Sequence, residues 1–255
     1  MHMKRGLTSV TFRNLIPETI VALVAEADLD GIEWAGDVHL PPGNTTRAKQ
    51  ISALTRNAGL ALPSYGSYYR AGDSAAPKDS FLQIRDTAVE LGVKAIRVWA
   101  GALSSDVSSE EYRRMVIDDL CRIGLLAREA GITIGCEYHC KTLTDTTESA
   151  LDLAEKTAQS NVKLYWQPPN GASYDYCLAG LKAILPYFCH AHVFSWKCTE
   201  TEIIRLPLAE KAEEWKKYLA LISLAAPESW AFLEFVKGDG PQQFQADAVT
   251  LKTWI

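Results

Sequence analysis

The amino-acid sequence predicts a single (β/α)8 barrel that spans residues 1–255. Short runs rich in β-branched and aromatic residues alternate with longer stretches of helical periodicity, and eight such pairs follow one another along the chain. No stretch rich in Pro, Gly and Ser divides them. Eight strand–helix pairs in 255 residues match the size and order of such a barrel.

The expected strands are short and largely apolar, as is typical of parallel strands that are buried on both faces. They cover residues 6–11, 31–34, 60–65, 95–99, 132–137, 162–167, 188–194 and 230–236. A doubly wound open sheet uses the same alternation of elements. The first strand-to-helix turn, residues 8–17, lacks the Gly-x-Gly-x-x-Gly pattern of dinucleotide-binding sheets, which favours the barrel.

The expected helices have apolar residues on one face and recognisable ends. Pro17 fits the first position of a helix, and Gly131 fits the position just after the end of one. One helix begins at Pro17, and the others are expected over about residues 45–57, 77–91, 109–130, 148–159, 174–185, 208–225 and 241–255.

Charge and hydropathy exclude several kinds of partner. Lys and Arg number 26 against 31 Asp and Glu, a net charge of −5, and no basic block suited to phosphate neutralisation is present. No apolar run approaches the roughly 18 residues of a membrane span, and residues 1–6 lack the apolar stretch of a signal peptide. We therefore expect a cytoplasmic protein that binds neither nucleic acid nor membrane.

Polar residues gather where the predicted strands end. In a barrel, functional groups come from the C-terminal ends of the strands and from the loops that follow. The candidates are, in chain order, Glu33, His39, Arg97, Trp99, Glu137, His139, Gln167, Asn170, His192 and Glu234. A buried carboxylate in an apolar strand needs a counter-ion or a metal. Two carboxylates, an imidazole and an amide oxygen at one mouth are suited to a divalent cation.

Four short motifs lie at strand ends in the expected order: Gly-Ile-Glu-Trp at 31–34, Gly-Cys-Glu-Tyr-His at 135–139, His-Ala-His-Val at 190–193 and Phe-Leu-Glu-Phe at 232–235. With these motifs the chain resembles the xylose isomerase-like barrels. This sugar phosphate isomerase/epimerase group also includes endonuclease IV, hydroxypyruvate isomerase and the ketose 3-epimerases. The resemblance covers essentially the whole chain.

The resemblance implies a divalent metal, usually manganese, magnesium or zinc, held by Glu137, Gln167, His192 and Glu234. Family members carry Asp where this chain has Gln167. A Gln carbonyl oxygen can ligate such an ion, but it brings no charge and binds more weakly. Metal occupancy is therefore expected to be lower than in the family.

The resemblance also implies a reaction. Glu137 and Glu234 would act as an acid–base pair that removes a proton next to a carbonyl and returns it through an enediolate. The expected substrate is a small sugar or polyol-derived compound, and an unphosphorylated compound is favoured over a phosphorylated one. The residues expected to contact it are His139, Glu33, Trp99, Asn170 and His39. Members of the family form dimers or tetramers, and we expect the same here.

Two alternatives remain open at this stage. One is metal-dependent hydrolase or lyase chemistry of the endonuclease IV kind, which the five His residues and the net charge of −5 disfavour. The other is a non-catalytic metabolite-binding barrel with a weakened metal site, which Gln167 keeps open.

Overall fold

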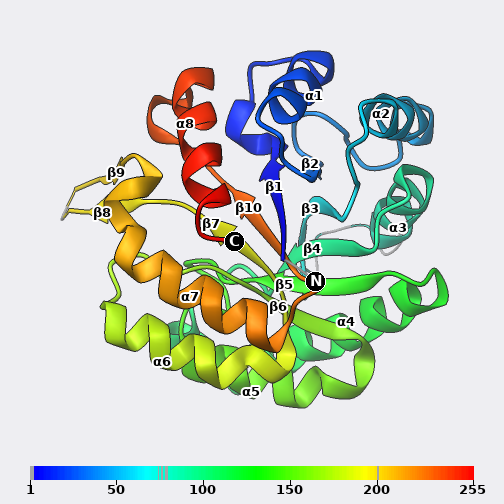
Figure 1. Ribbon diagram of the computed structural model, residues 1–255. Helices are drawn as coiled ribbons and strands as arrows, with labels where there is room; N and C mark the ends of the chain where they lie inside the picture. Colours follow the sequence, from blue (N-terminus) through cyan, green and yellow to red (C-terminus); the bar gives the residue numbers. More distant parts are fainter. Residues whose placement is uncertain (1–2, 74, 76, 78–79, 200) are drawn as a thin grey trace.

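The computed structural model describes residues 3–73, 75, 77, 80–199 and 201–255. Its centre is a closed barrel of parallel strands, with the helices packed around the outside (Figure 1). Around the barrel the strands follow the order β1-β10-β7-β6-β5-β4-β3-β2. The (β/α)8 barrel expected from the sequence is therefore confirmed.

The barrel strands are β1 (Lys4–Thr8), β2 (Gly31–Ala35), β3 (Ser64–Arg70), β4 (Ala95–Trp99), β5 (Thr133–Glu137), β6 (Val162–Trp166), β7 (Phe188–Val193) and β10 (Trp230–Leu233). The outer helices are α1 (Pro17–Glu26), α2 (Thr45–Asn57), α3 (Ser80–Leu91), α4 (Glu110–Glu129), α5 (Thr147–Thr157), α6 (Tyr174–Ile184), α7 (Ala212–Ala225) and α8 (Pro241–Lys252). The helix expected over 77–91 includes residues 78–79, which lie outside the described residues.

Helix starts are fixed by local signals in the sequence. Ser109, Thr146 and Ser173 each accept a hydrogen bond at 3.2–3.3 Å from the backbone N–H three residues later, which satisfies a donor in the first turn. Pro17 and Pro241 begin α1 and α8, where a missing N–H costs nothing.

Two strands begin and end at other residues than expected. β1 covers Lys4–Thr8 rather than 6–11, because the chain turns into a 3₁₀ helix over Ser9–Phe12. β3 begins at Ser64 rather than at residue 60, since Pro63 has no N–H to donate to a neighbouring strand. The predictions for these two strands were therefore wrong by several residues.

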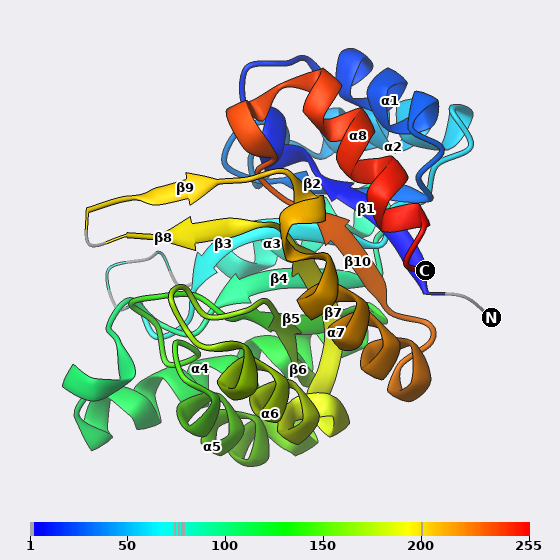
Figure 2. The same cartoon turned by 60° about the vertical axis from the view of Figure 1, so that its left-hand side comes forward.

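A hairpin that was not predicted interrupts the chain between β7 and α7. It consists of β8 (Trp196–Cys198) and β9 (Ile203–Arg205), which pair antiparallel. Figure 2 shows the hairpin extending past the barrel on the side opposite both termini. The sequence region 208–225 was expected to be one helix, but it is a 3₁₀ turn over Leu208–Lys211 followed by α7.

Aromatic rings fill the barrel interior below the strand ends. Phe232 stacks on Trp230 with centroids 5.6 Å apart, and His190 meets the rings of Phe232 and Tyr165 edge-on. Gly6 on β1 lies beside the Phe232 ring. Only glycine fits at this position, because a Cβ there would come within 2.7 Å of that ring. Burial lowers the pKa of His190 to about 4, so this imidazole is neutral. The polar side chains lie in the layer above these rings.

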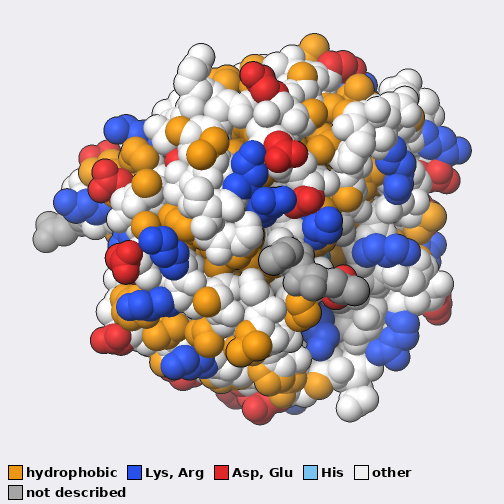
Figure 3. Space-filling view, viewed as in Figure 1, with side chains coloured by type: hydrophobic (Ala, Val, Ile, Leu, Met, Phe, Trp, Pro, Cys, Tyr) orange, Lys and Arg blue, Asp and Glu red, His pale blue; other side chains and the backbone are white. Residues whose placement is uncertain are grey.

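The outer surface carries both signs of charge. On the face seen in Figure 3, basic and acidic side chains are interspersed among polar and apolar ones. Among the described helices, none has the length and apolar character needed to cross a membrane.

Candidate active site

A pocket of about 730 Å³ opens where the barrel strands end. Its walls include Arg97 and Trp99 from β4, Glu137 from β5, and Glu234, which follows β10. Because all barrel strands are parallel, their carboxyl ends meet at this one mouth.

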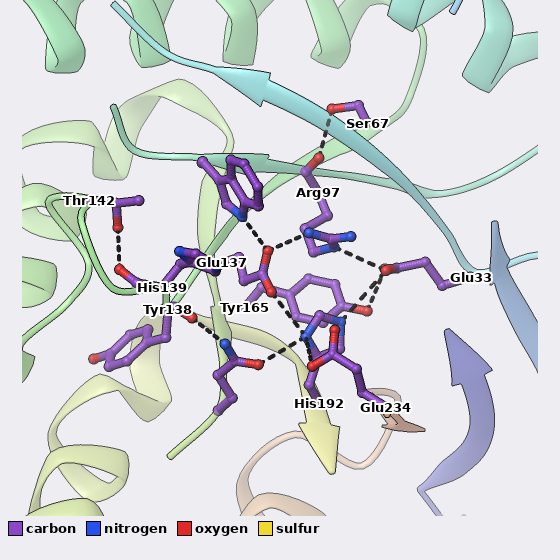
Figure 4. Close-up of polar contacts among 12 residues, drawn as sticks. Glu33, Ser67, Arg97, Glu137, Tyr138, His139, Thr142, Tyr165, His192 and Glu234 are labelled. Atoms are coloured by element: carbon purple, nitrogen blue, oxygen red, sulfur yellow. Dashed lines mark hydrogen bonds and ion pairs between the residues drawn. The ribbon is translucent and has the colours of Figure 1, made fainter. Parts of the chain in front are cut away.

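Of the four residues expected to hold a metal, Glu137, Gln167 and Glu234 line this pocket, and the buried His192 lies behind them within 3.5 Å of all three. His192 Nδ1 lies 3.2 Å from Gln167 Oε1, 3.3 Å from Glu137 Oε1 and 3.5 Å from Glu234 Oε2. Figure 4 shows the His192 ring pointing toward both carboxylates. Two strands, β5 and β7, and the loops after β6 and β10 thus deliver one donor atom each to the same small volume.

Gln167 is held in a defined orientation. Its Nε2 donates to the Tyr138 carbonyl oxygen at 2.5 Å, so the amide oxygen is the atom turned toward His192. The residue is therefore arranged to offer an oxygen ligand despite its missing charge.

Arg97 links two carboxylates inside the barrel. Its Nε donates to Glu33 Oε1 at 3.0 Å, and its Nη1 donates to Glu137 Oε2. All three side chains are nearly inaccessible, and Tyr165 Oη completes the network by donating to Glu33 Oε2 at 2.7 Å (Figure 4). The buried charges are thus paired, as their burial requires.

Glu33 also faces the far side of the His192 ring. Its Oε1 lies 3.6 Å from His192 Nε2, an atom that is buried and has no hydrogen bond within the described residues. A carboxylate behind the second ring nitrogen is the usual arrangement of a metal-ligating histidine, because it fixes the proton on that nitrogen. His192 Nδ1 is then free to act as a ligand.

Trp99 and Arg97 both donate hydrogen bonds to Oε2 of Glu137. The Trp99 indole Nε1 donates to Glu137 Oε2 at 2.5 Å. The guanidinium of Arg70 covers the indole at 4.2 Å, and the His139 ring lies 4.7 Å away. One oxygen of Glu137 is therefore bonded by two donors while Oε1 faces His192.

The buried charges shift the pKa values of the site in opposite directions. Burial raises the pKa of Glu137, but Arg97 and His192 outweigh burial and lower it to about 2. Burial raises the pKa of Glu234 to about 7; His192 opposes the rise and Glu137 adds to it. Burial lowers the pKa of His192, but Glu234, Glu137 and Glu33 raise it to about 10. Without a metal, the His192 imidazolium is therefore the counter-ion of these carboxylates, and a cation that displaced its Nδ1 proton would take over that role.

The donor set fits a divalent cation. Oxygen and nitrogen ligands about 2.0–2.2 Å from Zn²⁺, Mg²⁺ or Mn²⁺ are themselves roughly 3.0–3.5 Å apart. The three separations from His192 Nδ1 fall in this range, and one ligand atom each from Glu137, His192 and Glu234 lie within 4.8 Å of one another. Gln167 adds a neutral fourth donor.

The other residues expected at the site are distributed differently. Trp99, His139 and Asn170 line the pocket. Glu33 is 1% exposed and does not line it, since Arg97 and Tyr165 occupy its oxygens. His39 is buried elsewhere, with Nδ1 bonded to Ser9 Oγ at 2.9 Å.

Arg97 is the residue for which sequence reasoning assigned no role. The signal was present, because a charged residue inside the apolar run 95–99 needs a buried partner just as Glu234 does. The partners, Glu33 and Glu137, lie on different strands and became evident in the structure.

A family model described as "Xylose isomerase-like TIM barrel" matches residues 21–225. The chain belongs to this family. The match covers most of the chain and confirms the resemblance inferred from the strand-end motifs. Comparison with curated proteins gives no match.

Several solved structures resemble this xylose isomerase-like barrel. The probable 3-DHS dehydratase AsbF from Bacillus anthracis is 19% identical with a TM-score of 0.80 over 98% of this chain and 99% of that one. The 3-keto-D-glucoside 4-epimerase YcjR from E. coli is 16% identical, with a TM-score of 0.74 over 98% and 99%. A xylose isomerase-like protein from Mycobacterium smegmatis in complex with magnesium is 14% identical, with a TM-score of 0.70 over 99% and 97%. At these identities the likeness shows the shared fold.

Proposed function

We propose that this xylose isomerase-like barrel is a divalent-metal-dependent sugar isomerase or epimerase. The observation that carries the proposal is the convergence of Glu137, Gln167 and Glu234 on Nδ1 of His192, at the base of a pocket of about 730 Å³. Pockets of this size accept small molecules. The similar structures that bear the names of an epimerase and a dehydratase support an enzymatic role.

Glu137, Gln167, His192 and Glu234 would hold the cation. When bound there, a divalent cation supplies Lewis-acid polarisation of a substrate carbonyl, which makes the neighbouring C–H more acidic. Glu33 would keep the His192 ring in the ligating orientation through its contact with Nε2. The hydrogen bond from Gln167 Nε2 to the Tyr138 carbonyl oxygen would likewise keep the Gln167 amide oxygen in the ligating orientation.

The two glutamates have unequal freedom to move a proton. Glu137 Oε2 already accepts hydrogen bonds from Arg97 and Trp99. Glu234 lines the pocket, and its nearest charged neighbour of opposite sign is His192 at 3.5 Å. We therefore assign the first proton abstraction to Glu234, which afterwards releases that proton to solvent. Glu137 Oε1 would take up a proton from solvent and deliver it to the other face of the carbon.

Dehydration is the second candidate, favoured by the similarity to the probable 3-DHS dehydratase. Loss of water from a β-hydroxy carbonyl compound begins with the same abstraction of a proton next to the carbonyl. Product analysis separates the two reactions, because an epimerase conserves the mass of its substrate and a dehydratase loses one water.

The test combines metal analysis with proton exchange. Protein purified without chelator is assayed for bound metal, reloaded with Mn²⁺, Mg²⁺ or Zn²⁺, and incubated with a panel of ketoses in D₂O. We expect metal-dependent deuterium incorporation at the carbon next to the carbonyl, and its loss in chelator-treated protein. A metal-loaded protein that exchanges no proton on any ketose and dehydrates no β-hydroxy ketone would contradict the proposal.

A further inference from the structure

A second pocket of about 390 Å³ lies directly beside the first. The two share four lining residues, namely Pro168, Pro169, Asn170 and Trp196. These residues, from the loop after β6 and from β8, therefore form a wall that the two pockets have in common. A single sugar ring above the Glu137–Glu234 pair leaves the second pocket empty.

The walls of the second pocket are aromatic. Phe194, Trp196 and Trp215 line it, and Trp196 stacks on Phe194 with ring centroids 3.9 Å apart. Trp215 is fixed by a hydrogen bond from its Nε1 to the Phe194 carbonyl oxygen at 2.6 Å. Phe194 and Trp215 are buried and support Trp196, whose partly exposed indole is the aromatic surface open to the apolar C–H face of a sugar ring.

The hairpin that carries Trp196 is attached to the catalytic side of the barrel. Arg205 on β9 lies over the ring of Phe235 at 4.4 Å and forms an ion pair with Asp239. Phe235 directly follows Glu234 and lines the first pocket. One set of contacts therefore holds the wall between the pockets in place relative to the reacting groups.

Polar groups at the rim favour an uncharged, hydroxyl-rich ligand. Among the described residues that line the second pocket, the cations are Lys197 and Lys211, and Lys211 is paired with Glu214 at 2.8 Å. An ion pair and the Asn170 amide offer both donors and acceptors to hydroxyl groups. A phosphate would find one ammonium group, Lys197, that has no ion-pair partner among the described residues, and Lys197 is exposed.

We propose that the second pocket is a subsite for the second ring of a glycoside, so that the substrate is a sugar unit linked to another sugar. The inference rests on the proposed function, because it places the reacting ring in the first pocket beside Glu234. The second ring then lies past Trp196 and contacts the Pro168–Pro169 turn, Trp196 and the Lys211–Glu214 pair.

The test measures binding of one-ring and two-ring ketoses to metal-loaded protein by calorimetry. The probes are D-fructose and two disaccharides that contain fructose, turanose and lactulose. We expect at least one disaccharide to bind about tenfold or more tighter than fructose, a gain of the size that one stacked ring contributes. Equal or weaker binding of both disaccharides, including no binding, overturns the subsite.

Variants locate the effect. Ala172 lines the second pocket but not the first, so Ala172→Phe should abolish the advantage of the disaccharide and leave fructose binding unchanged. Ala53→Phe on the exposed face of α2 is the matched control and should change neither. If Ala172→Phe does not fold, Cys198→Tyr fills the same pocket from the exposed hairpin. A disaccharide advantage that survives in a folded pocket-filling variant contradicts the proposal.

The same samples separate this inference from the proposed function. Tight disaccharide binding that depends on Ala172, without deuterium exchange, supports the subsite and contradicts the isomerase. Exchange on fructose without any disaccharide advantage supports the isomerase and contradicts the subsite.

Discussion

Arg97 and Glu137 form a buried ion pair at the base of the pocket, and the guanidinium reaches Glu33 at the same time. Arg97 is 2% exposed, so water cannot replace it as a partner of either carboxylate. This one side chain therefore links the network below the pocket to the residue that we place at the reacting carbon. It also fixes which oxygen of Glu137 remains available.

Arg97→Met should destabilise the protein strongly. Removing one partner of a buried pair leaves uncompensated charge, here on Glu33 and Glu137, and typically costs about 3–5 kcal/mol in the free energy of unfolding. Urea denaturation measures this loss in the free energy of unfolding. Lys156→Met is the control, because Lys156 forms an exposed pair with Asp152 at 2.8 Å and should cost under about 1 kcal/mol. Comparable losses in the two variants would show that Arg97 is not needed to balance these carboxylates.

Gln167→Asp should tighten Mn²⁺ binding, because a charged oxygen replaces a neutral one among the proposed ligands. A carboxylate at this position cannot donate the hydrogen bond that the Gln167 amide gives the Tyr138 carbonyl oxygen, so both Gln167→Asp and Gln167→Glu lose that contact. Gln167→Glu, which keeps the length, serves as the matched variant. Calorimetric titration that gives equal or weaker Mn²⁺ affinity in both would count against Gln167 as a ligand.

Glu234→Gln should reduce turnover and solvent deuterium exchange by roughly 10²–10⁴-fold, the usual contribution of a positioned acid or base. The amide keeps an oxygen for the metal, so metal content is measured on the same sample. Glu137→Gln should lose activity to a similar extent, whereas the exposed Glu228→Gln should behave as wild type. Wild-type exchange rates in a metal-loaded Glu234→Gln variant would remove Glu234 from the chemistry.

Asp30 should make stability fall in acid. Burial raises the pKa of Asp30, but hydrogen bonds from the Arg5 backbone and guanidinium, with the charges of Arg5 and Lys4, outweigh burial and lower it. A lowered folded-state pKa stabilises the protein above the unfolded-state pKa near 3.9, and this stabilisation disappears as the pH falls through the folded-state value.

Asp30→Asn should therefore lower the free energy of unfolding by about 1–2 kcal/mol at pH 7, which is the contribution of charge-assisted hydrogen bonds. The loss should become progressively smaller below about pH 5. Thermal or urea unfolding from pH 3 to pH 7 measures the difference between variant and wild type. A difference that stays constant over this range would show that the Asp30 charge contributes nothing. Asp152→Asn, at an exposed pair, is the control.

The sequence by itself determined the barrel and the position of the four donor residues along it. Periodicity identifies parallel strands, and parallel strands place Glu137, Gln167, His192 and Glu234 at one mouth wherever the strand boundaries lie within a residue or two. The family motifs lie at these same strand ends, so they too can be recognised from the sequence. These conclusions need local patterns and a topological rule, but no knowledge of how side chains meet.

Tertiary structure decided which polar groups are partners. Arg97 and Glu33 are 64 positions apart, and their bond depends on the stagger of strands that are not neighbours in the barrel. His39 was expected to face the substrate, yet it lies buried against Ser9. Periodicity says which face of a strand a residue occupies. Contacts across the barrel depend on side-chain packing between distant segments, which no local pattern encodes.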